Sequence, residues 1–513
     1  MALLGRFEKT VAKFAGPGGN GRVSGTSLPG MLLTSNMLLN AARTRSAFAI
    51  RPTQFRHPCL DEEYHVSQPP SSGKPSSGEQ SSANPRTAGP RTVRDVVFVD
   101  GVRTPFGRAG EKGIYAGTRA DDLVVKCIRE LMRRNPSLPA DRIDEVAIAA
   151  TTQTGDQGLT IGRTAALLAG LPRTVPGFAI DRMCAGAMTA VTTTASGIGF
   201  GAYDVVIAGG VEHMGNHPMG AGADPNPRFM SERIVDPAAL NMGNTAENLH
   251  DRFPAITKDR TDAYAVASQD KLAAAYAKDQ IQPDLVPVAT MKPGRGWTVN
   301  TVDEPPRPGT SVHDLAALKT PFRAHGRVTA GNAAGLNDGA TAALLASADA
   351  AEELGLPVKM RLVSYAFAGV EPEVMGIGPV PATEKALKNA GLGIGDIGLF
   401  EINEAFAVQV LSFLDHFGIA DDDPRVNRYG GAIAVGHPLA SSGVRLMNQL
   451  ARQFEEDPTV RFGMTTMCIG LGMGATVIWE NPHHAAYGLA LDEMTDTAPA
   501  QTTAPTTETG AAA

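Results

Sequence analysis

The chain contains 513 residues, more than one hydrophobic core normally accommodates, so two or more folding units are expected. Hydrophobic residues make up 43% of it and charged residues 19%, a balance typical of a globular enzyme. Its net charge of −7, without a long basic run, argues against a nucleic-acid-binding protein. No apolar stretch reaches the roughly 18 residues that a transmembrane helix requires.

The four cysteines, Cys59, Cys127, Cys184 and Cys468, are scattered and form no Cys-x-x-Cys pair. This spacing argues against a zinc site and against a disulfide scaffold, and it favours a reducing compartment. Cys127 lies on the apolar face of a predicted helix over 123–132, so we assign it to the core. Cys59 lies outside the predicted catalytic fold.

Residues 1–92 form a predicted N-terminal extension. Residues 67–91 are rich in Pro, Ser and Gly and have few large apolar side chains, which predicts a disordered linker. Residues 1–58 carry many basic side chains against one acid, Glu8. Several apolar residues near the start share one face of a predicted helix: Leu3, Leu4, Phe7, Val11 and Phe14.

The basic, amphipathic start of the chain is compatible with a transit peptide, a membrane-surface helix or a dispensable extension. A start codon placed too far upstream would produce the same dispensable extension. No clear processing site is visible, which favours the extension. We therefore expect a cytoplasmic protein, and a mitochondrial one if residues 1–58 are a transit peptide.

Strands and helices alternate over the next part of the chain, and the alternation is repeated later. The first half contains predicted strands at 96–99, 145–150, 178–180 and 204–208 and helices at 121–133 and 189–198. The second half contains strands at 361–366, 397–402, 462–467 and 475–479, and helices at 382–390 and from 441 onward. This pattern predicts an α/β protein whose mixed sheets are covered on both faces.

Between the halves, residues 212–327 break the alternation with many Pro and Gly residues and one predicted helix at 260–277. A long irregular insertion of this kind is usually functional. His213 and His217 lie near its start with a spacing that could bind a metal on a helix. Gly and Pro residues interrupt any helix there and no carboxylate pair supports the site, so we predict no metal.

Cys184 follows the strand at 178–180 and precedes a helix of small apolar residues. The unpaired N–H groups of a helix start favour negative charge, so this position predicts a thiol with a lowered pKa. Such a thiolate is a candidate nucleophile. The alternative is a small hydrophobic residue at a tight contact between helix and strand.

Three later motifs also follow predicted strands, where the active sites of α/β proteins gather. They are Asn403-Glu404-Ala405-Phe406, Gly436-His437-Pro438 and Cys468-Ile469-Gly470. Taken singly, each has a structural explanation: a cap, a buried histidine or an inert cysteine. Their occurrence together with Cys184, in this order, makes coincidence improbable.

This ordered set resembles the thiolase family, and the resemblance extends over residues 93–482. Further matching segments are 102–107, 242–248 and 329–339. The resemblance implies a five-layered α-β-α-β-α fold of two similar halves with an inserted loop domain that covers coenzyme A. The implied parts are an N-terminal half at 93–211 and 328–345, a loop domain at 212–327, a C-terminal half at 346–482 and a disordered tail at 483–513.

The resemblance also implies the chemistry: cleavage of a 3-ketoacyl-CoA by coenzyme A, through an acyl-cysteine, in fatty-acid β-oxidation. Cys184 would be the nucleophile and His437 would accept its proton. His437 and Asn403, the latter through a water, would hold the enolate of the leaving acetyl-CoA. Cys468 would act as acid and base, and the N–H of Gly470 would join that of Cys184 in an oxyanion hole.

No permanently bound cofactor is implied, because coenzyme A is a substrate. The candidates for contact with it are Ala334 and Gly335; Ala334 stands where many members have Ser. The implied partners are acyl-CoA and coenzyme A, further copies of the chain in a homodimer or homotetramer, and a hydratase/dehydrogenase subunit.

Three other functions stay open at this stage. An acetyl-CoA acetyltransferase, which condenses two acetyl-CoA molecules, would use the same residues. A ketoacyl synthase would have no use for Cys468. A non-catalytic lipid-CoA carrier would be signalled by a lost catalytic side chain, and none is lost here.

Overall fold

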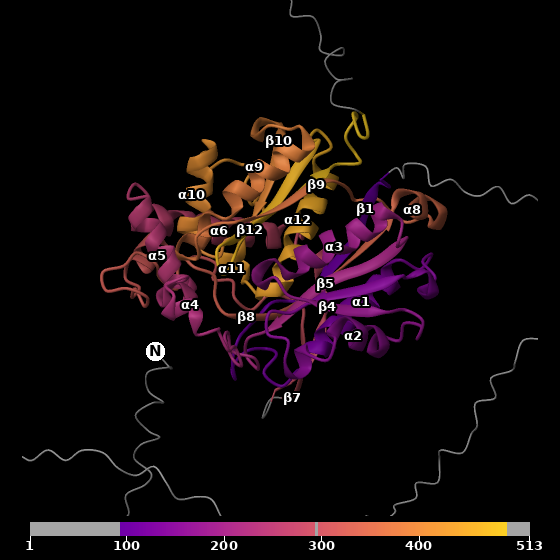
Figure 1. The fold of residues 1–513 in the computed structure, drawn as a ribbon, viewed down its shortest axis with the longest axis horizontal. Helices are drawn as coiled ribbons and strands as arrows, with labels where there is room; N and C mark the ends of the chain where they lie inside the picture. The colour runs from indigo at the N-terminus through magenta and orange to yellow at the C-terminus, as the bar shows by residue number, and fades with distance from the viewer. Residues whose placement is uncertain (1–92, 293–295, 490–513) are drawn as a thin grey trace, which may run out of the picture. The chain divides into compact units, whose positions relative to one another are not determined.

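The structure is a computed structural model that describes residues 93–292 and 296–489 (Figure 1). The predicted N-terminal extension, with Cys59, lies outside the described residues, as do residues 490–513 of the predicted tail. Among the described helices, none combines the length and the apolar character needed to cross a membrane.

The first half is built on a mixed sheet in the strand order β4-β3-β5-β8-β1. Its strands are β1 (Val96–Arg103), β3 (Glu145–Ala149), β4 (Gly177–Ile180), β5 (Val205–His213) and β8 (Asn337–Ser347), with the short β2 (Gly107–Arg108) beside β8. β3 runs parallel to β4 and β5, whereas β8 is antiparallel to β5 and β1.

The central strand β8 was not predicted from the sequence. It is buried along its whole length and consists largely of alanine and other small residues. A strand that is covered on both faces does not alternate between apolar and polar residues, so the usual strand signal is absent.

The second half repeats the strand order of the first. Its strands are β9 (Met360–Gly369), β10 (Ile397–Ile402), β11 (Phe462–Ile469) and β12 (Met473–Glu480). They are arranged β10-β11-β12-β9, which corresponds to β3-β5-β8-β1. Only two residue pairs, Val97–Arg361 and Phe98–Met360, join β1 to β9, so the halves keep separate sheets in practice. The prediction of two similar halves is confirmed.

Helices complete five layers around these sheets (Figure 1). α1 (Ala120–Arg134) and α2 (Ile161–Ala169) cover the outer face of the first sheet, and α9 (Pro379–Ala390) and α10 (Ala407–Phe417) cover that of the second. α3 (Gly186–Phe200) and α12 (Ser442–Glu456) pack against each other between the sheets. The predicted core position of Cys127 on α1 is confirmed.

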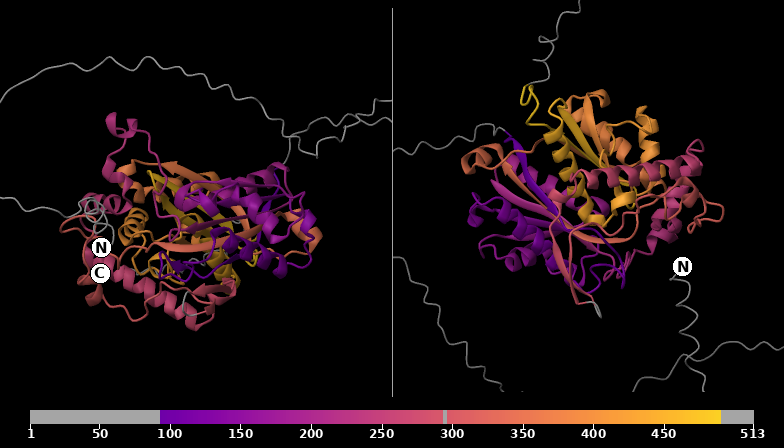
Figure 2. Two further views of the ribbon diagram at one scale, coloured as in Figure 1. Left: turned by 90° about the horizontal axis from the view of Figure 1, so that it is seen from below. Right: turned by 180° about the vertical axis from the view of Figure 1, so that it is seen from behind.

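The residues between β5 and β8 form a separate insertion. It contains α4 (Arg228–Ser231), α5 (Met242–Arg252), α6 (Lys258–Ala277), β6 (Val288–Lys292), β7 (Gly296–Asn300) and α7 (Val312–Ala316). The view from behind in Figure 2 shows α6 lying across the second half, where it contacts α10 and α11 (Ala432–Val435). After β8 the chain continues through α8 (Ala348–Leu354).

A buried ion pair fastens this insertion to the first half. Arg103, at the end of β1, donates to both carboxylate oxygens of Asp303 at 2.6 and 2.8 Å. The same carboxylate accepts from the backbone N–H of Phe106 at 2.6 Å and from the Tyr276 hydroxyl at 2.5 Å. The charged pair therefore has the additional hydrogen bonds that burial demands.

The end of the described chain differs from the sequence-based expectation. Residues 483–489 were assigned to the disordered tail, but they form turns that fold back on the second half. The N–H of Gly488 donates to Glu480 at 3.3 Å, and Arg461 donates to the backbone oxygen of Leu489 at 2.6 Å. Residues 483–489 are mostly small or polar, so the sequence did not indicate these contacts with Glu480 on β12 and with Arg461 just before β11.

Candidate functional site

Cys184 lies in a tight turn at the end of β4. The turn is a single 3-10 helix, η3 (Met183–Ala185), that leads into α3. Met183 has a left-handed backbone with a φ of +45°, and its N–H donates to the Asp181 carboxylate at 2.7 Å. A left-handed conformation is strained for methionine, and such strain occurs preferentially at functional sites.

The two candidate thiols come together although 284 positions of sequence separate them. Cys468 is buried at the end of β11, which contacts η3. The backbone N–H of Gly470 faces the sulfur of Cys184, and negative charge on Cys184 raises the pKa of Cys468. The structure thus brings Cys184, Cys468 and Gly470 into one site.

The prediction of a lowered thiol pKa is wrong for the site as it stands. Burial raises the pKa of Cys184 to about 12, although the N–H groups of Gly470 and of Cys184 itself oppose the shift. Burial also raises the pKa of Cys468 well above its usual value. The prediction considered only the amides at a helix start and not the hydration that the thiol loses when the fold partly buries it.

His437 is held in one orientation by its neighbours. Gly436 has a φ of +103°, a conformation that favours glycine, and the N–H of His437 donates to Asn337 at 2.9 Å. The ring atom Nδ1 lies 2.6 Å from the Ser442 hydroxyl, and Nε2 lies 3.4 Å from the amide nitrogen of Asn403.

His437 is neutral at physiological pH. Burial, with the nearby charge of Arg445, lowers the pKa of His437 to about 3. The amide N–H of Asn403 can only donate, so Nε2 carries the lone pair and the proton sits on Nδ1, where it donates to Ser442. A free Nε2 lone pair is what a proton acceptor requires.

Asn403 and Glu404, which are neighbours in the sequence, have different roles. The backbone N–H of Asn403 donates to Thr466 at 2.9 Å, which places Asn403 at the joined ends of β10 and β11. Glu404 turns away from the site and accepts from Tyr264 at 3.0 Å and from Ser268 at 2.6 Å, both on α6. Asn403 is therefore available for chemistry, whereas Glu404 fastens the insertion.

One close contact unites the thiol pair with the His437–Asn403 pair. Ala440, three residues after His437, packs directly against Gly186, two residues after Cys184. The five residues predicted for catalysis thus derive from the ends of β4, β10 and β11 and from the turn before α12. Active sites commonly form where strands end in α/β sheets.

A cavity of about 520 Å³ approaches this site from the insertion. Its lining includes Gly335, Asn337, Arg108 and Arg307. Because Asn337 also accepts from the N–H of His437, the cavity extends to the histidine turn. Gly335 is therefore placed to contact a ligand, whereas Ala334 does not line the cavity and donates its N–H to Ala405 at 3.0 Å.

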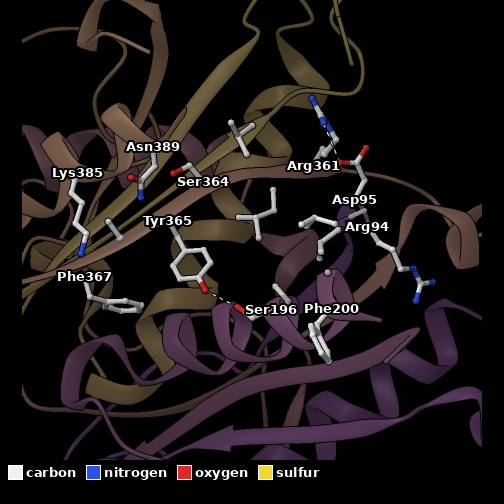
Figure 3. Close-up of a pocket in the computed structure, with 17 residues that line it drawn as sticks. Arg94, Asp95, Ser196, Phe200, Arg361, Ser364, Tyr365, Phe367, Lys385 and Asn389 are labelled. Atoms are coloured by element: carbon white, nitrogen blue, oxygen red, sulfur yellow. Dashed lines mark hydrogen bonds and ion pairs between the residues drawn. The ribbon is translucent and has the colours of Figure 1, made fainter. Parts of the chain in front are cut away.

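A larger cavity of about 900 Å³ lies elsewhere, between α3 and β9 (Figure 3). It contains the hydrogen bond of 2.6 Å between Tyr365 and Ser196, together with the charged side chains of Arg361 and Lys385. None of the predicted site residues, all of which are described, lines it. The larger of these two cavities is therefore not the one beside the predicted site residues.

The two histidines at the start of the insertion have separate partners. His213 is buried, and its Nε2 lies 3.0 Å from the backbone oxygen of Tyr115. His217 pairs with Asp156, which also accepts from the N–H of Ala120 and so caps α1. Within the described ranges, no group of three His, Cys, Asp or Glu side chains is arranged to hold a metal ion.

Three residues of the site were not predicted from the sequence: Asn337, Ser442 and Arg445. Asn337 contacts His437 across 100 positions of the chain, which a single sequence does not show, whereas Ser442 is only five residues from His437. Arg445 gave no separate signal, because it lies with Gln449 and Gln453 on one polar face of α12.

Comparison with known proteins assigns most of the described residues to one family. Residues 96–349 match the family described as "Thiolase, N-terminal domain", and residues 356–481 match "Thiolase, C-terminal domain". A 3-ketoacyl-CoA thiolase of Aliivibrio fischeri is 41% identical over 392 residues, which cover 76% of this chain and all of that relative. A beta-ketoadipyl-CoA thiolase of Escherichia coli is 41% identical over 403 residues, with the same coverage.

A solved structure shows the same similarity. The acetyl-CoA acetyltransferase of Bacillus anthracis has a TM-score of 0.68 and 34% sequence identity. The match covers 76% of this chain and 99% of that one.

Proposed function

The chain belongs to the thiolase family of acyltransferases, and we propose that it cleaves 3-ketoacyl-CoA with coenzyme A during fatty-acid β-oxidation. The products are acetyl-CoA and an acyl-CoA that is two carbons shorter. The observation that carries this proposal is the meeting of Cys184 and Cys468, together with the packing of the turn that follows the neutral His437 against the turn that follows Cys184. A carbon–carbon cleavage of this type needs a nucleophile, a proton acceptor and a separate acid, and the site supplies all three.

In the first half-reaction, the Cys184 sulfur attacks the β-keto carbon while its proton moves to Nε2 of His437. Because burial raises the pKa of Cys184 to about 12, deprotonation accompanies the attack and does not precede it. The bond between the α and β carbons then breaks. Asn403 and protonated His437 hold the enolate oxygen, and Cys468 gives its proton to the departing carbon, which releases acetyl-CoA.

In the second half-reaction, the Cys468 thiolate takes the proton of incoming coenzyme A, whose sulfur attacks the acyl group on Cys184. The backbone N–H groups of Cys184 and Gly470 hold the resulting oxyanion; each donor of this kind contributes about 3 kcal/mol in the transition state. The Cys184 sulfur leaves and recovers its proton from His437. Every proton donated in the first half-reaction is thereby returned.

The cavity that Asn337 lines is the proposed binding site of coenzyme A. Gly335 lies on its wall, and Asn337, which also lines it, accepts a hydrogen bond from the N–H of His437. Arg307 is exposed on its rim, where a guanidinium can pair with a phosphate. Coenzyme A is a substrate in this scheme, and no permanently bound cofactor takes part.

The second candidate function is acetyl-CoA acetyltransferase, because the structurally similar Bacillus anthracis protein carries that name. The two functions are separated by measuring coenzyme A-dependent loss of ketoacyl-CoA with chains of 4, 8 and 16 carbons and with a dicarboxylic 3-oxoadipyl substrate. Activity on the four-carbon substrate alone supports the acetyltransferase. Activity that rises with chain length supports β-oxidation, and no turnover of any substrate leaves a lipid-CoA carrier.

Exchange of each thiol for a hydroxyl tests the assigned roles. Cys184→Ser should abolish formation of the acyl-enzyme, because a hydroxyl is a far weaker nucleophile than a thiol. Cys468→Ser should still form some acyl-enzyme but lose at least about 100-fold in turnover, since general acid–base catalysis contributes that much. Mass spectrometry of the enzyme after brief exposure to ketoacyl-CoA distinguishes the two. Near-normal turnover by Cys184→Ser would refute the assignment.

We further propose that the protein forms a homodimer or homotetramer in the cytoplasm. β4 supports self-association, because it pairs with β3 on one side and with no other strand in the described part of the chain. The two relatives named above are bacterial, which supports the cytoplasm and gives no support to a mitochondrial location. A hydratase/dehydrogenase subunit is a proposed partner, because such an enzyme produces 3-ketoacyl-CoA.

A further inference from the structure

The face of α12 that is turned toward β10 carries a buried polar stripe. Arg445, Gln449 and Gln453 follow one another at intervals of four residues and so lie along one face of the helix. The side chain of Arg445 is completely buried, and the two glutamines are buried with it. We call these three residues the α12 stripe.

Two residues at the end of β10 face the α12 stripe: Glu401 in the strand and Asn403 just after it. Glu401 and Asn403 are two positions apart, so their side chains point to the same side of the strand. Gln453 donates to Glu401 at 2.6 Å, and Arg445 donates to Gln449 at 2.5 Å. Arg445 also lies 3.7 Å from the second carboxylate oxygen of Glu401, which provides its counter-charge.

Stability alone does not explain a charged group at this position. Two ions removed from water lose hydration that their mutual attraction seldom restores, and a well-packed apolar pair is often as stable. The pairing here is also incomplete: Nε of Arg445 and one oxygen of Glu401 have no hydrogen-bond partner in the described structure. Burial accordingly lowers the pKa of Arg445 and raises that of Glu401 to about 7.

The remaining contact of Arg445 leads to the catalytic site. Its Nη2 donates to the amide oxygen of Asn403 at 3.3 Å. A guanidinium has hydrogen-bond donors and no acceptor. It can therefore pair with the oxygen of the amide but not with the amide N–H groups. The nitrogen edge of Asn403 must then point the other way, where it lies 3.4 Å from Nε2 of His437.

We propose that Arg445 is a positioning residue that fixes the amide of Asn403 with its N–H groups toward the reacting atoms. The inference rests on the proposed function, in which Asn403 helps to hold the enolate oxygen. If the amide rotated by half a turn, its oxygen would face Nε2 and the enolate oxygen. A stabilising donor would then become a repelling acceptor at the point where negative charge develops.

The α12 stripe keeps Arg445 itself in place. Gln449 holds one nitrogen of the guanidinium, while Gln453 orients the carboxylate that balances its charge. The charge of Arg445 also contributes to the low pKa of His437, which keeps that ring neutral before substrate binds. One buried cation thus acts on both members of the His437–Asn403 pair.

A double-mutant cycle tests this inference with thiolysis as the readout. Arg445→Lys keeps the charge but cannot present two nitrogens to Gln449 and Asn403 together, so kcat should fall about 10-fold while KM changes less than about threefold. Asn403→Ala should lower kcat about 100-fold. In the Asn403→Ala background, Arg445→Lys should lower kcat by less than about twofold, because the amide it positions is gone.

A second variant keeps the test valid if Arg445→Lys folds poorly. Gln449→Met leaves every charge in place and removes one support of the guanidinium, so it should lower kcat about threefold, again only when Asn403 is present. Arg452→Lys is the matched control, because Arg452 lies two turns further along α12 and pairs with Asp284 at 2.5 Å. Its kcat should equal that of the wild type.

The outcomes separate the inference from the proposed function. Equal losses from Arg445→Lys and from Gln449→Met with and without Asn403 would overturn the positioning role while leaving thiolysis established. A wild-type enzyme that turns over no ketoacyl-CoA would instead refute the proposed function. Melting temperatures of all variants identify any loss that reflects unfolding.

Discussion

At the scale of single residues, the site is governed by the exclusion of water. Burial lowers the pKa of His437 to about 3 and raises that of Cys184 to about 12, so both groups are uncharged before substrate arrives. In the proposed mechanism, charges on these groups therefore arise only as bonds form. Interactions that strengthen in the transition state raise the rate, whereas a charge already present in the free enzyme would also need stabilisation there.

The low pKa of His437 predicts a pH-dependent stability. The unfolded imidazole binds a proton below about pH 6.5, whereas the folded one does so only near pH 3. Between these values the unfolded chain binds more protons, so the free energy of unfolding falls as the pH falls. His437 should account for a loss of about 2 kcal/mol between pH 7.5 and pH 5.

Urea denaturation of the wild type and of His437→Asn at pH 7.5, 6 and 5 measures this contribution. Between pH 7.5 and pH 5, the free energy of unfolding of the variant should fall by about 2 kcal/mol less than that of the wild type. His416→Asn is the control, because His416 is exposed on α10. If His437→Asn and the wild type showed parallel pH profiles, the pKa of His437 would be the same in the folded and unfolded chains, and the predicted contribution would be wrong.

At the scale of helices and strands, the site depends on how closely α3 and α12 approach each other. Both helices are buried on almost every side. α3 consists mostly of small residues and lacks the polar face of a surface helix, whereas α12 has polar side chains that are themselves buried. Gly443 is the tightest point: an added Cβ would lie 2.6 Å from the backbone nitrogen of Met188. This contact sets the distance between Cys184 and the turn that holds His437.

Gly443→Ala should therefore weaken both the fold and the site. Backbone atoms cannot move aside as a flexible side chain can, so we expect a loss of about 1–3 kcal/mol in the free energy of unfolding and a lower kcat. Denaturant melts and thiolysis rates measure the two effects. Gly395→Ala is the control, because an added Cβ there meets no atom within 4 Å; it should match the wild type in both measurements.

At the scale of the whole molecule, the proposed self-association depends on the edge of β4 that no other strand pairs with in residues 93–292 and 296–489. Ile180 accepts a hydrogen bond from Ala150 at 3.2 Å and thus directs its backbone groups toward β3. Neighbouring residues of a strand direct theirs to opposite sides, so Ala179 directs its N–H outward. An unpaired edge of this kind readily pairs with another strand, and a second copy of the chain offers an identical one.

Ala179→Pro should convert the oligomer to a monomer. Proline removes the outward N–H while the bonds between β4 and β3 remain. Sedimentation velocity should show the wild type as a dimer or a larger assembly and the variant as a monomer. Ala179→Ser keeps both the N–H and the small size, so it should sediment like the wild type. An Ala179→Pro protein that still sediments as an oligomer would exclude the edge of β4 as the contact.

Much of the candidate site was predictable because its residues stand in short sequence motifs. Cys184, Asn403, His437 and Cys468 each follow a predicted strand, and their order matches one family. The alternation of strands and helices also indicated two similar halves. Both signals are local or periodic, so they survive in a single sequence.

Only the tertiary structure decided the features that depend on burial or on contacts between distant segments. The pKa of Cys184 rises because the fold partly buries the thiol and removes hydration from it, which no neighbour in the sequence reveals. The strand β8 escaped prediction because burial on both faces removes the alternation of polar and apolar residues. Arg445 acquires its partners only when α12 packs against β10, since charge and hydrogen bonding act through space and not along the chain.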